Sequence, residues 1–320
     1  MVNIREFLLT FDTEDFITPK AVSVLEKLLE KLDKNNFKAL FFISGHMAER
    51  LSQQPQIIDL LNEHEIGYHS SSHSVHPTIF EFTDVENYET AYQESIKRET
   101  SHIDPLTGKI GAQGGIVFLK SLFPSKQISA FRAPGCCWSP PHLEALRDLG
   151  IKFDFSTSMY SKTFSYKDIT FYPYSTLGDW QNKQSYYRLF LLSIIKRKIT
   201  IAGLHPSFFL NLDDWDSIYW NGNPSKLVVT QLREDAETSM LLKTFDLFLK
   251  RVKYLEKIGL IQTNPNLKES SKQISITAED VTRCYEHSIR WPKRLFKYEP
   301  KYLRNHFFKF FNVPLSNKTI

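Results

Sequence analysis

Acidic residues gather at the end of the first apolar segment of the chain. Residues 8–11 are largely apolar, and Asp12, Glu14 and Asp15 follow them. A strand buried on both faces is a nearly continuous apolar run, and α/β folds carry their chemistry at the carboxyl ends of such strands. Carboxylates in that place can bind a metal ion, or they can cap a helix or line a solvated turn. The first interpretation predicts one half of a metal site.

Histidines gather in a second short segment. His69, His73 and His76 fall close together among serines. Imidazole nitrogens are common ligands of zinc and related ions. His69 and His73 have the i, i+4 spacing that one helical turn would place on a common face. We expect these two histidines to be the other half of the metal site, with capping of a helix as the alternative.

Regular elements can be predicted around these clusters. Residues 21–32 have an amphipathic helical pattern, and residues 39–45 form a second apolar run that ends in glycine. Together with the first run they predict a strand, a helix and a strand. Residues 84–101 predict an exposed helix. Residues 108–115 predict a glycine-rich loop, which we interpret as a hinge because it lacks the Gly-Lys-Ser/Thr ending of a phosphate-binding loop.

These motifs resemble those of the polysaccharide deacetylase family, the NodB-homology group of carbohydrate esterase family four. The family's first motif, Thr-Phe-Asp-Asp, is similar to residues 10–12, and its second motif, His-Ser/Thr-x-x-His, is similar to residues 69–73. The resemblance implies that Asp12 is the catalytic base and that His69 and His73 bind the metal. It also implies an α/β fold, a distorted (β/α) barrel of about seven strands.

Three later segments resemble the remaining motifs of this family. Residues 131–135 resemble its Arg-x-Pro motif, which implies that Arg132 orients the catalytic base. Residues 201–206 resemble its last motif, an apolar strand that ends in Leu-His, which implies that His205 is the general acid. Between them the family has an acidic motif, and Asp154 is the best candidate for it.

The first motif departs from the family's form, in which a second Asp directly follows the first. Thr13 stands in that place here. Because residues i and i+2 share a face of an extended strand, we expect Glu14, beside Asp12, to be the carboxylate ligand, with Asp15 as the alternative. With the two histidines it completes a three-ligand site, for which zinc is the expected ion. His76 matches no role in the family and is interpreted as a partner of the ligands, or as a ligand if the register is shifted.

The third motif departs as well. Gly135 stands where the family usually has an aromatic residue, and the adjacent Cys136 and Cys137 follow it. A backbone N–H in this segment can still serve an oxyanion. The wall that contacts the sugar must differ from that of the family.

The resemblance predicts a metal-dependent hydrolase that removes an N-acetyl group from an amino sugar or a sugar-containing glycan precursor. Two alternatives stay open. One is an enzyme of the same fold that acts on another C–N bond, as allantoinase-like and deformylase-like enzymes do. The other is a catalytically silent carbohydrate-binding or scaffold protein, against which the intact motif residues argue. Acidic and aromatic residues at 213–216 and 219–224 could contact a sugar or cover the mouth of the barrel.

Composition bounds the organisation of the chain. Its 320 residues, of which 42% are hydrophobic, suffice for one large core and an appendage. We expect a catalytic barrel over residues 1–265 and a mainly helical extension over residues 266–320. The three cysteines do not make a disulfide framework, and residues 1–5 run straight into the first strand, which leaves no room for a signal sequence. We therefore expect a cytoplasmic protein.

The last forty residues differ from the rest in charge. Residues 281–320 carry nine Lys or Arg against two Glu, a net charge of +7, whereas the whole chain has +4. Nine aromatic residues are interleaved with this charge, and residues 277–280 resemble a capping box that opens a helix. Such a segment can contact an anionic membrane peripherally, bind a partner, or pack its aromatics on the barrel, which we favour. With no recognition module beside it, nucleic acid is not an expected partner.

Overall fold

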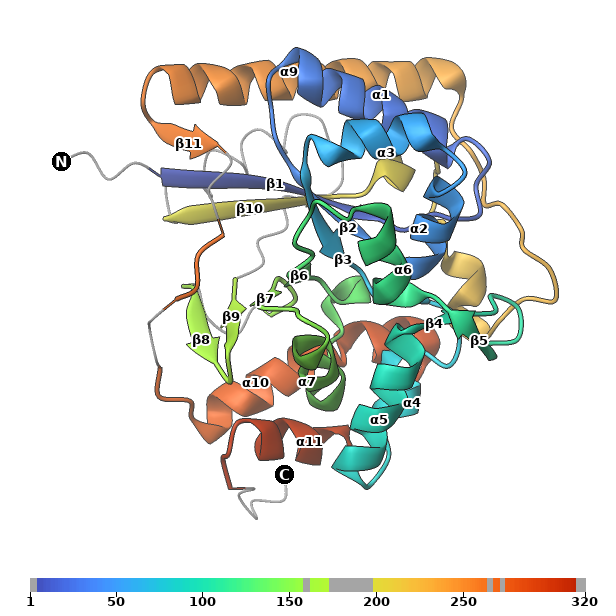
Figure 1. Cartoon of the computed structure of the whole chain (residues 1–320), viewed down its shortest axis with the longest axis vertical. Helices are drawn as coiled ribbons and strands as arrows, with labels where there is room; N and C mark the ends of the chain where they lie inside the picture. The colour runs from blue at the N-terminus through green and yellow to red at the C-terminus, as the bar shows by residue number, and fades with distance from the viewer. Residues whose placement is uncertain (1–4, 158–161, 173–197, 264–266, 271–273, 315–320) are drawn as a thin grey trace.

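One curled sheet runs through the molecule. The computed structural model describes residues 5–157, 162–172, 198–263, 267–270 and 274–314 (Figure 1). The strand order is β10-β1-β2-β3-β6-β7-β9-β8, and every neighbouring pair is parallel except β8 and β9. In chain order the strands are β1 (Arg5–Thr13), β2 (Leu40–Ile43), β3 (Glu65–Tyr68), β6 (Ala130–Phe131), β7 (Phe153–Asp154), β8 (Phe164–Tyr166), β9 (Ile169–Phe171) and β10 (Ile199–Leu204).

The sheet is an open half-barrel in the part of the chain that the structure describes, where no ladder joins β8 to β10. A further short strand, β11 (Ile261–Thr263), pairs with the amino-terminal end of β1. Glu6 and Phe7 pair with both β10 and β11, so these two strands lie on opposite edges of β1. The predicted α/β fold with a barrel of about seven strands is confirmed, in this open form.

Helices cover the outside of the sheet because their apolar residues recur at helical spacing. In α1 (Ala21–Lys34), the buried side chains at 24, 25, 28, 29 and 32 make one face. This face packs against the same core as Phe7 and Phe11 of β1, whose rings make edge contacts with Phe248 and Phe245 of α9 (Asp235–Lys257). Leu8, between them in sequence, points into a separate cluster on the other face. Both faces of β1 are thus apolar, as expected from its sequence.

The other helices on this scaffold are α2 (Gly45–Leu51), α3 (Pro55–Asn62), α4 (Ile79–Thr83), α5 (Tyr88–Glu99), α6 (Gly115–Leu122) and α7 (Pro140–Asp148). The helix predicted over residues 84–101 is therefore present as α5. It is not exposed on all sides, because Arg98 and Glu99 at its end are buried.

Residues 108–115, predicted to be a hinge loop, instead complete a β-hairpin and lead into α6. Strand β5 (Ile110–Gln113) pairs antiparallel with β4 (Ser101–Ile103). The turn is set by Asp104, whose side chain accepts hydrogen bonds from the N–H groups of Leu106 and Thr107. Gly108 closes it with φ of +69°, and a Cβ there would meet the carbonyl oxygen of His76 at 2.0 Å. The glycines thus serve a tight turn and close packing.

The tail is helical and packs its aromatic side chains on the barrel. It contains α10 (Ala278–Ser288), which begins with the predicted capping box at Thr277, a short turn of helix at Pro292–Phe296, and α11 (Leu303–Phe310). Phe307, Phe310 and Phe311 are buried, and their rings surround Trp138 at centroid distances of 4.8, 5.9 and 6.3 Å. The basic side chains of the tail are mostly exposed.

This packing accounts for most of the aromatic residues that could have contacted a membrane. Trp291, which is 39% exposed, and the lysines and arginines around it are the part that a membrane surface could reach. Peripheral contact with an anionic membrane and the boundary at residue 265 stay predictions. Among the described helices, none combines the length and the hydropathy needed to span a bilayer.

Removal of the Phe307 ring should destabilise the whole protein if the tail is part of the core. Phe307 is fully buried between Trp138 and Tyr285. We expect Phe307→Ala to lower the free energy of unfolding by about 3–5 kcal/mol, measured by urea unfolding. Lys293→Ala, which removes only an exposed ion pair with Glu299, should change it by less than about 1 kcal/mol. Equal effects of the two variants would contradict this role of the tail.

His64 should make stability depend on pH. Its side chain is buried, and its Nδ1 accepts a hydrogen bond from the N–H of Ala39 at 3.3 Å. Burial, with Lys38 nearby, lowers the pKa of His64 to about 4. The unfolded chain binds a proton below about 6.5, so the stabilisation is fully present above that pH and is lost as the pH falls towards 4.

We expect protonation of His64 in the unfolded chain to lower the free energy of unfolding by about 2 kcal/mol when the pH falls from 7 to 5. His64→Asn keeps an acceptor near the Ala39 N–H but does not titrate. Urea unfolding of both proteins at the two pH values measures the difference. The expectation fails if the variant loses as much stability on acidification as the wild type.

Candidate metal centre and active site

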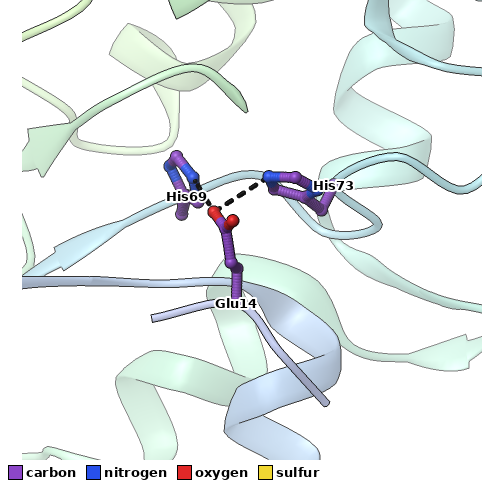
Figure 2. A group of neighbouring side chains, drawn as sticks. All are labelled: Glu14, His69 and His73. Carbon is purple, nitrogen blue, oxygen red and sulfur yellow. Dashed lines mark hydrogen bonds and ion pairs between the residues drawn. The ribbon is translucent and has the colours of Figure 1, made fainter. Parts of the chain in front are cut away.

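The carboxylate of Glu14 lies between two imidazoles. Figure 2 shows the side chain of Glu14 pointing at His69 and His73, which come from the loop after β3. Oε2 of Glu14 is 2.7 Å from Nε2 of His69 and 2.9 Å from Nε2 of His73. All three side chains are at most 8% exposed. The structure thus brings together the three residues expected to hold a metal.

Each histidine makes a second hydrogen bond through Nδ1, on the side of the ring away from Glu14. These bonds determine the tautomer of each neutral ring. Nδ1–H of His69 donates to the carbonyl oxygen of Arg132 at 2.7 Å. The hydroxyl of Ser74 donates to Asp216, so its oxygen accepts from Nδ1–H of His73 at 2.6 Å. In the neutral rings both Nε2 atoms therefore direct lone pairs at the same carboxylate oxygen.

The three groups converge on one point, where ring protons of the histidines or a bound cation must lie between the nitrogens and the carboxylate. Burial opposes the charged form of Glu14, but the charge of His73 and hydrogen bonds from both histidines hold the pKa of Glu14 well below its usual value. Burial also opposes the charged form of His73, and Glu14 and Asp216 nevertheless raise its pKa. Two imidazoles and a carboxylate, each oriented by a second hydrogen bond, are a donor set that fits a zinc-class divalent ion.

The loop that carries the histidines is not helical, contrary to the expectation from their spacing. Ser70 and His73 both have positive φ, +63° and +48°. The carbonyl oxygens of Ser70 and Ser71 accept from the N–H groups of Gly45 and His46 at the start of α2, at 2.9 and 3.2 Å. Two left-handed residues in a loop held this way turn the chain back and bring His73 over His69.

A buried carboxylate supports this loop from the side of α5. Glu99 accepts a hydrogen bond from the N–H of Ser71 at 2.8 Å, and it also contacts the hydroxyl of Tyr68 and Nε2 of His142. Tyr68 is the last residue of β3, so Glu99 joins the strand, the loop and α7. The loop conformation therefore depends on helices that lie outside the first two motifs.

The second part of the site is a buried ion pair beside the metal donors. Nη1 of Arg132 is 2.7 Å from Oδ1 of Asp12, and its guanidinium lies over the ring of Phe42. Nε2 of His205 is 3.5 Å from Oδ2 of Asp12. His205 directly follows β10, which pairs with β1. Asp12 is thus held between a fixed cation and a histidine that is 23% exposed.

Two other acidic residues singled out in the sequence have structural roles. Asp15 caps the following turn through the N–H groups of Ile17 and Thr18 and accepts from Asn211, so it is turned away from the histidines. Glu14 is the carboxylate that lies with the two histidines, and Asp15 is not part of this cluster. Asp154 binds the N–H and hydroxyl of Ser156, and burial raises the pKa of Asp154 to about 6.

His76 takes no part in the cluster. Its Nδ1 lies 2.8 Å from the carboxylate of Glu81, and its Nε2 lies 2.6 Å from the carbonyl oxygen of Tyr219. Both ring nitrogens are used, and they join the loop around residue 219 to α4. His76 is therefore a structural residue rather than a ligand.

The sequence analysis missed two partners of the metal donors. Nε1–H of Trp215 donates to Oε1 of Glu14 at 2.9 Å, which leaves Oε2 directed at the histidines. Asp216 accepts from Ser74 and lies 3.6 Å from Nδ1 of His73. Both belong to the acidic and aromatic segment 213–216, which had been expected to contact sugar or cover the barrel mouth. The mixture of acidic and aromatic residues indicated that this segment has a role near the site. It did not specify which side chains the segment would contact.

The two adjacent cysteines in the third motif are buried free thiols. Burial raises the pKa of Cys136 to about 12 and raises that of Cys137 well above its usual value. Thiols of this kind are poor nucleophiles. Gly135 before them has φ of +56°, the left-handed conformation that glycine adopts most easily.

A family model described as Polysaccharide deacetylase matches residues 2–113. Over this segment the chain is similar to the polysaccharide deacetylase family. This segment contains Asp12 and the three metal donors, whereas Arg132 and His205 follow it. No curated protein matches the chain.

Several solved structures resemble the chain at low sequence identity. A Streptococcus mutans CE4 esterase is 15% identical, with a TM-score of 0.47, over 82% of this chain and 86% of that one. A putative polysaccharide deacetylase from Mycobacterium smegmatis is 12% identical, with a TM-score of 0.47, over 83% and 95%. A CE4 family pseudoenzyme from Bacillus anthracis is 13% identical, with a TM-score of 0.40, over 79% of this chain. The chain spans only 63% of the length of that pseudoenzyme.

Loss of the two histidines should remove a bound divalent ion from this deacetylase-like segment. We expect His69→Ala/His73→Ala to bind one zinc ion fewer per chain than the wild type, because a single carboxylate cannot hold the ion. Elemental analysis after dialysis against zinc measures this. Asp15→Asn is the matched control and should retain the full content, whereas Glu14→Gln should not. An unchanged zinc content in the double variant would exclude the site.

Proposed function

We propose that the chain is a metal-dependent hydrolase that removes an N-acetyl group from an amino sugar or a sugar-containing glycan precursor. One observation carries the proposal: Asp12, held by Arg132 and facing His205, lies directly beside the buried donors Glu14, His69 and His73. Hydrolysis of an amide requires a base for water and an acid for the departing amine. The cluster offers one group for each task next to a cation site.

The task of the base falls to Asp12. A divalent ion held by Glu14, His69 and His73, zinc in our proposal, would supply Lewis-acid polarisation of the acyl carbonyl and of the attacking water. Asp12 takes the proton of that water through Oδ2, since Arg132 occupies Oδ1. The guanidinium of Arg132 is fully buried, so it fixes the direction of the carboxylate.

The task of the acid falls to His205. Its Nε2 is close to Asp12, and its side chain is the most exposed of the cluster at 23%, so it can meet a substrate. An amine is a poor leaving group unless it is protonated, and a positioned histidine supplies this proton. Its ring packs edge-on against Phe208, which keeps it facing Asp12.

Removal of either proton-transfer group should abolish most of the activity and leave the metal in place. We expect Asp12→Asn and His205→Ala each to lower kcat by about two to four orders of magnitude, the usual contribution of such a group. Acetate release from N-acetylated amino sugars and their oligomers, with zinc content measured in parallel, tests this. Asp235→Asn, which loses only an exposed ion pair with Lys20, is the control and should be fully active.

The same assay separates the alternatives. Formate or ammonia in place of acetate would indicate another C–N bond as the target. No turnover by the zinc-loaded wild type on N-acetylated and N-formylated sugars would contradict the proposal and favour a silent carbohydrate-binding protein. Near-wild-type kcat in Asp12→Asn would refute the assignment of the base alone.

A further inference from the structure

A second group of potential metal ligands lies outside the site described above. His46 and Glu49 come from α2, and His102 comes from β4. One donor atom of each lies within 4.8 Å of the other two. The two carboxylate oxygens of Glu49 are 2.8 and 2.9 Å from Nδ1 of His102, and one of them is 3.8 Å from Nδ1 of His46. Two imidazoles and a carboxylate thus converge from two separate elements.

His46 is the residue of this group that most needs an explanation. Its side chain is 5% exposed, and its Nε2 has no hydrogen-bond partner among the described residues. Its Nδ1 is too far from Glu49 for a hydrogen bond. Packing nevertheless holds the ring in place, with Phe16 and His102 at centroid distances of 4.5 and 5.8 Å. Nδ1 is the nitrogen that faces Glu49, and a buried imidazole nitrogen held against a carboxylate without a hydrogen bond fits a ligand poised for a cation.

The distances suit one small ion. Two ligands about 2.0–2.1 Å from a tetrahedral zinc ion are about 3.3 Å apart. The contacts of Glu49 with His102 and His46, at 2.8 and 3.8 Å, lie on either side of this value. The first centre has similar contacts between its carboxylate and its imidazoles, 2.7 and 2.9 Å. Shifts of about half an ångström would bring these carboxylate–imidazole contacts of both groups to the spacing of metal ligands.

The charge and the exposure of the group also suit a cation. The carboxylate of Glu49 lies between two imidazoles and gives the group an anionic ligand. The side chains of Glu49 and His102 are 29% and 38% exposed, which opens one side of the group to solvent. A metal ion can enter there, and water can complete its coordination.

We propose that His46, Glu49 and His102 form a second divalent-cation site of the zinc class, which joins α2 to the β4–β5 hairpin. Two nitrogens and one carboxylate oxygen come from the protein and the remaining ligands from water. Binding through Nδ1 of His102 moves the ring proton to Nε2. The side chain of His102 is partly exposed, so its Nε2–H can donate a hydrogen bond to water. The proposal does not rest on the hydrolytic function.

The place of this site in the fold gives it a structural role. The N–H of His46 donates to the carbonyl oxygen of Ser71 at 3.2 Å, and the hydroxyl of Ser71 donates to the carbonyl oxygen of Ser101 at 2.9 Å. Ser71 lies between His69 and His73 of the first centre. An ion bound at the second site would therefore connect α2 and β4, the two elements that hold the loop with His69 and His73 through Ser71.

Zinc stoichiometry separates the two sites. We expect about two zinc ions per chain in the wild type and about one in His69→Ala/His73→Ala, in which only the second site remains. His46→Ala/His102→Ala should also retain about one, and the four-fold variant none. The second site should further show tetrahedral cobalt absorption in His69→Ala/His73→Ala, and zinc should raise the melting temperature of that variant. Loss of this absorption in the four-fold variant assigns it to the proposed residues.

Two milder variants keep the test valid if His46→Ala fails to fold. His102→Asn and Glu49→Gln alter exposed side chains, and each should lose the cobalt absorption in the His69→Ala/His73→Ala background. His287→Asn, a partly buried histidine of α10 outside both groups, should leave it unchanged. The proposal is overturned if His69→Ala/His73→Ala binds no zinc, or if its zinc persists undiminished after His102→Asn and Glu49→Gln.

Discussion

The buried guanidinium of Arg132 is the constraint on which the rest of the site depends. A charge removed from water in this way needs an opposite charge in contact, and Asp12 supplies it at 2.7 Å. The backbone carbonyl of the same residue accepts the ring N–H of His69. One residue directly after β6 thus sets the direction of the proposed base and the tautomer of a candidate metal ligand. A shift of Arg132 would therefore break its buried contacts with both Asp12 and His69.

The candidate metal ligands are in turn oriented by groups from distant parts of the chain. Trp215 and Asp216 contact Glu14 and His73 from the loop after β10, and Glu99 holds the metal loop from α5. The contacts of Trp215 and Glu99 satisfy polar atoms that burial would otherwise leave unpaired. The site is therefore a connected polar network inside an apolar half-barrel, and its geometry is a property of the whole fold.

Much of this arrangement could be predicted from the sequence because it follows from short periodic signals. The apolar run before Asp12 specifies β1, the spacing of leucines specifies α1, and i, i+2 alternation placed Glu14 beside Asp12. Spacing failed where loops decide the outcome. The i, i+4 distance of His69 and His73 suggested a helix, but positive φ at Ser70 and hydrogen bonds to α2 produce the same proximity in a loop.

Contacts between distant segments could not be predicted from the sequence for a related reason. Nothing in residues 213–216 states that Trp215 will reach Glu14, because that contact depends on how the chain returns after β10. The hairpin over 101–113 was missed because glycines that serve a tight turn and close packing have the same composition as a flexible loop.

The pairing of β1 with β10 has a consequence for folding during synthesis of the chain. Thr10 donates to the carbonyl oxygen of Ala202 across 192 residues of sequence, so one edge of β1 must wait for a strand that is synthesised much later. During translation this apolar strand has an open edge of N–H and C=O groups, the kind of edge to which foreign strands add. Asp12 meets His205 only when β10 arrives. The nascent chain is therefore most exposed to misassociation before it contains both halves of its proposed acid–base pair.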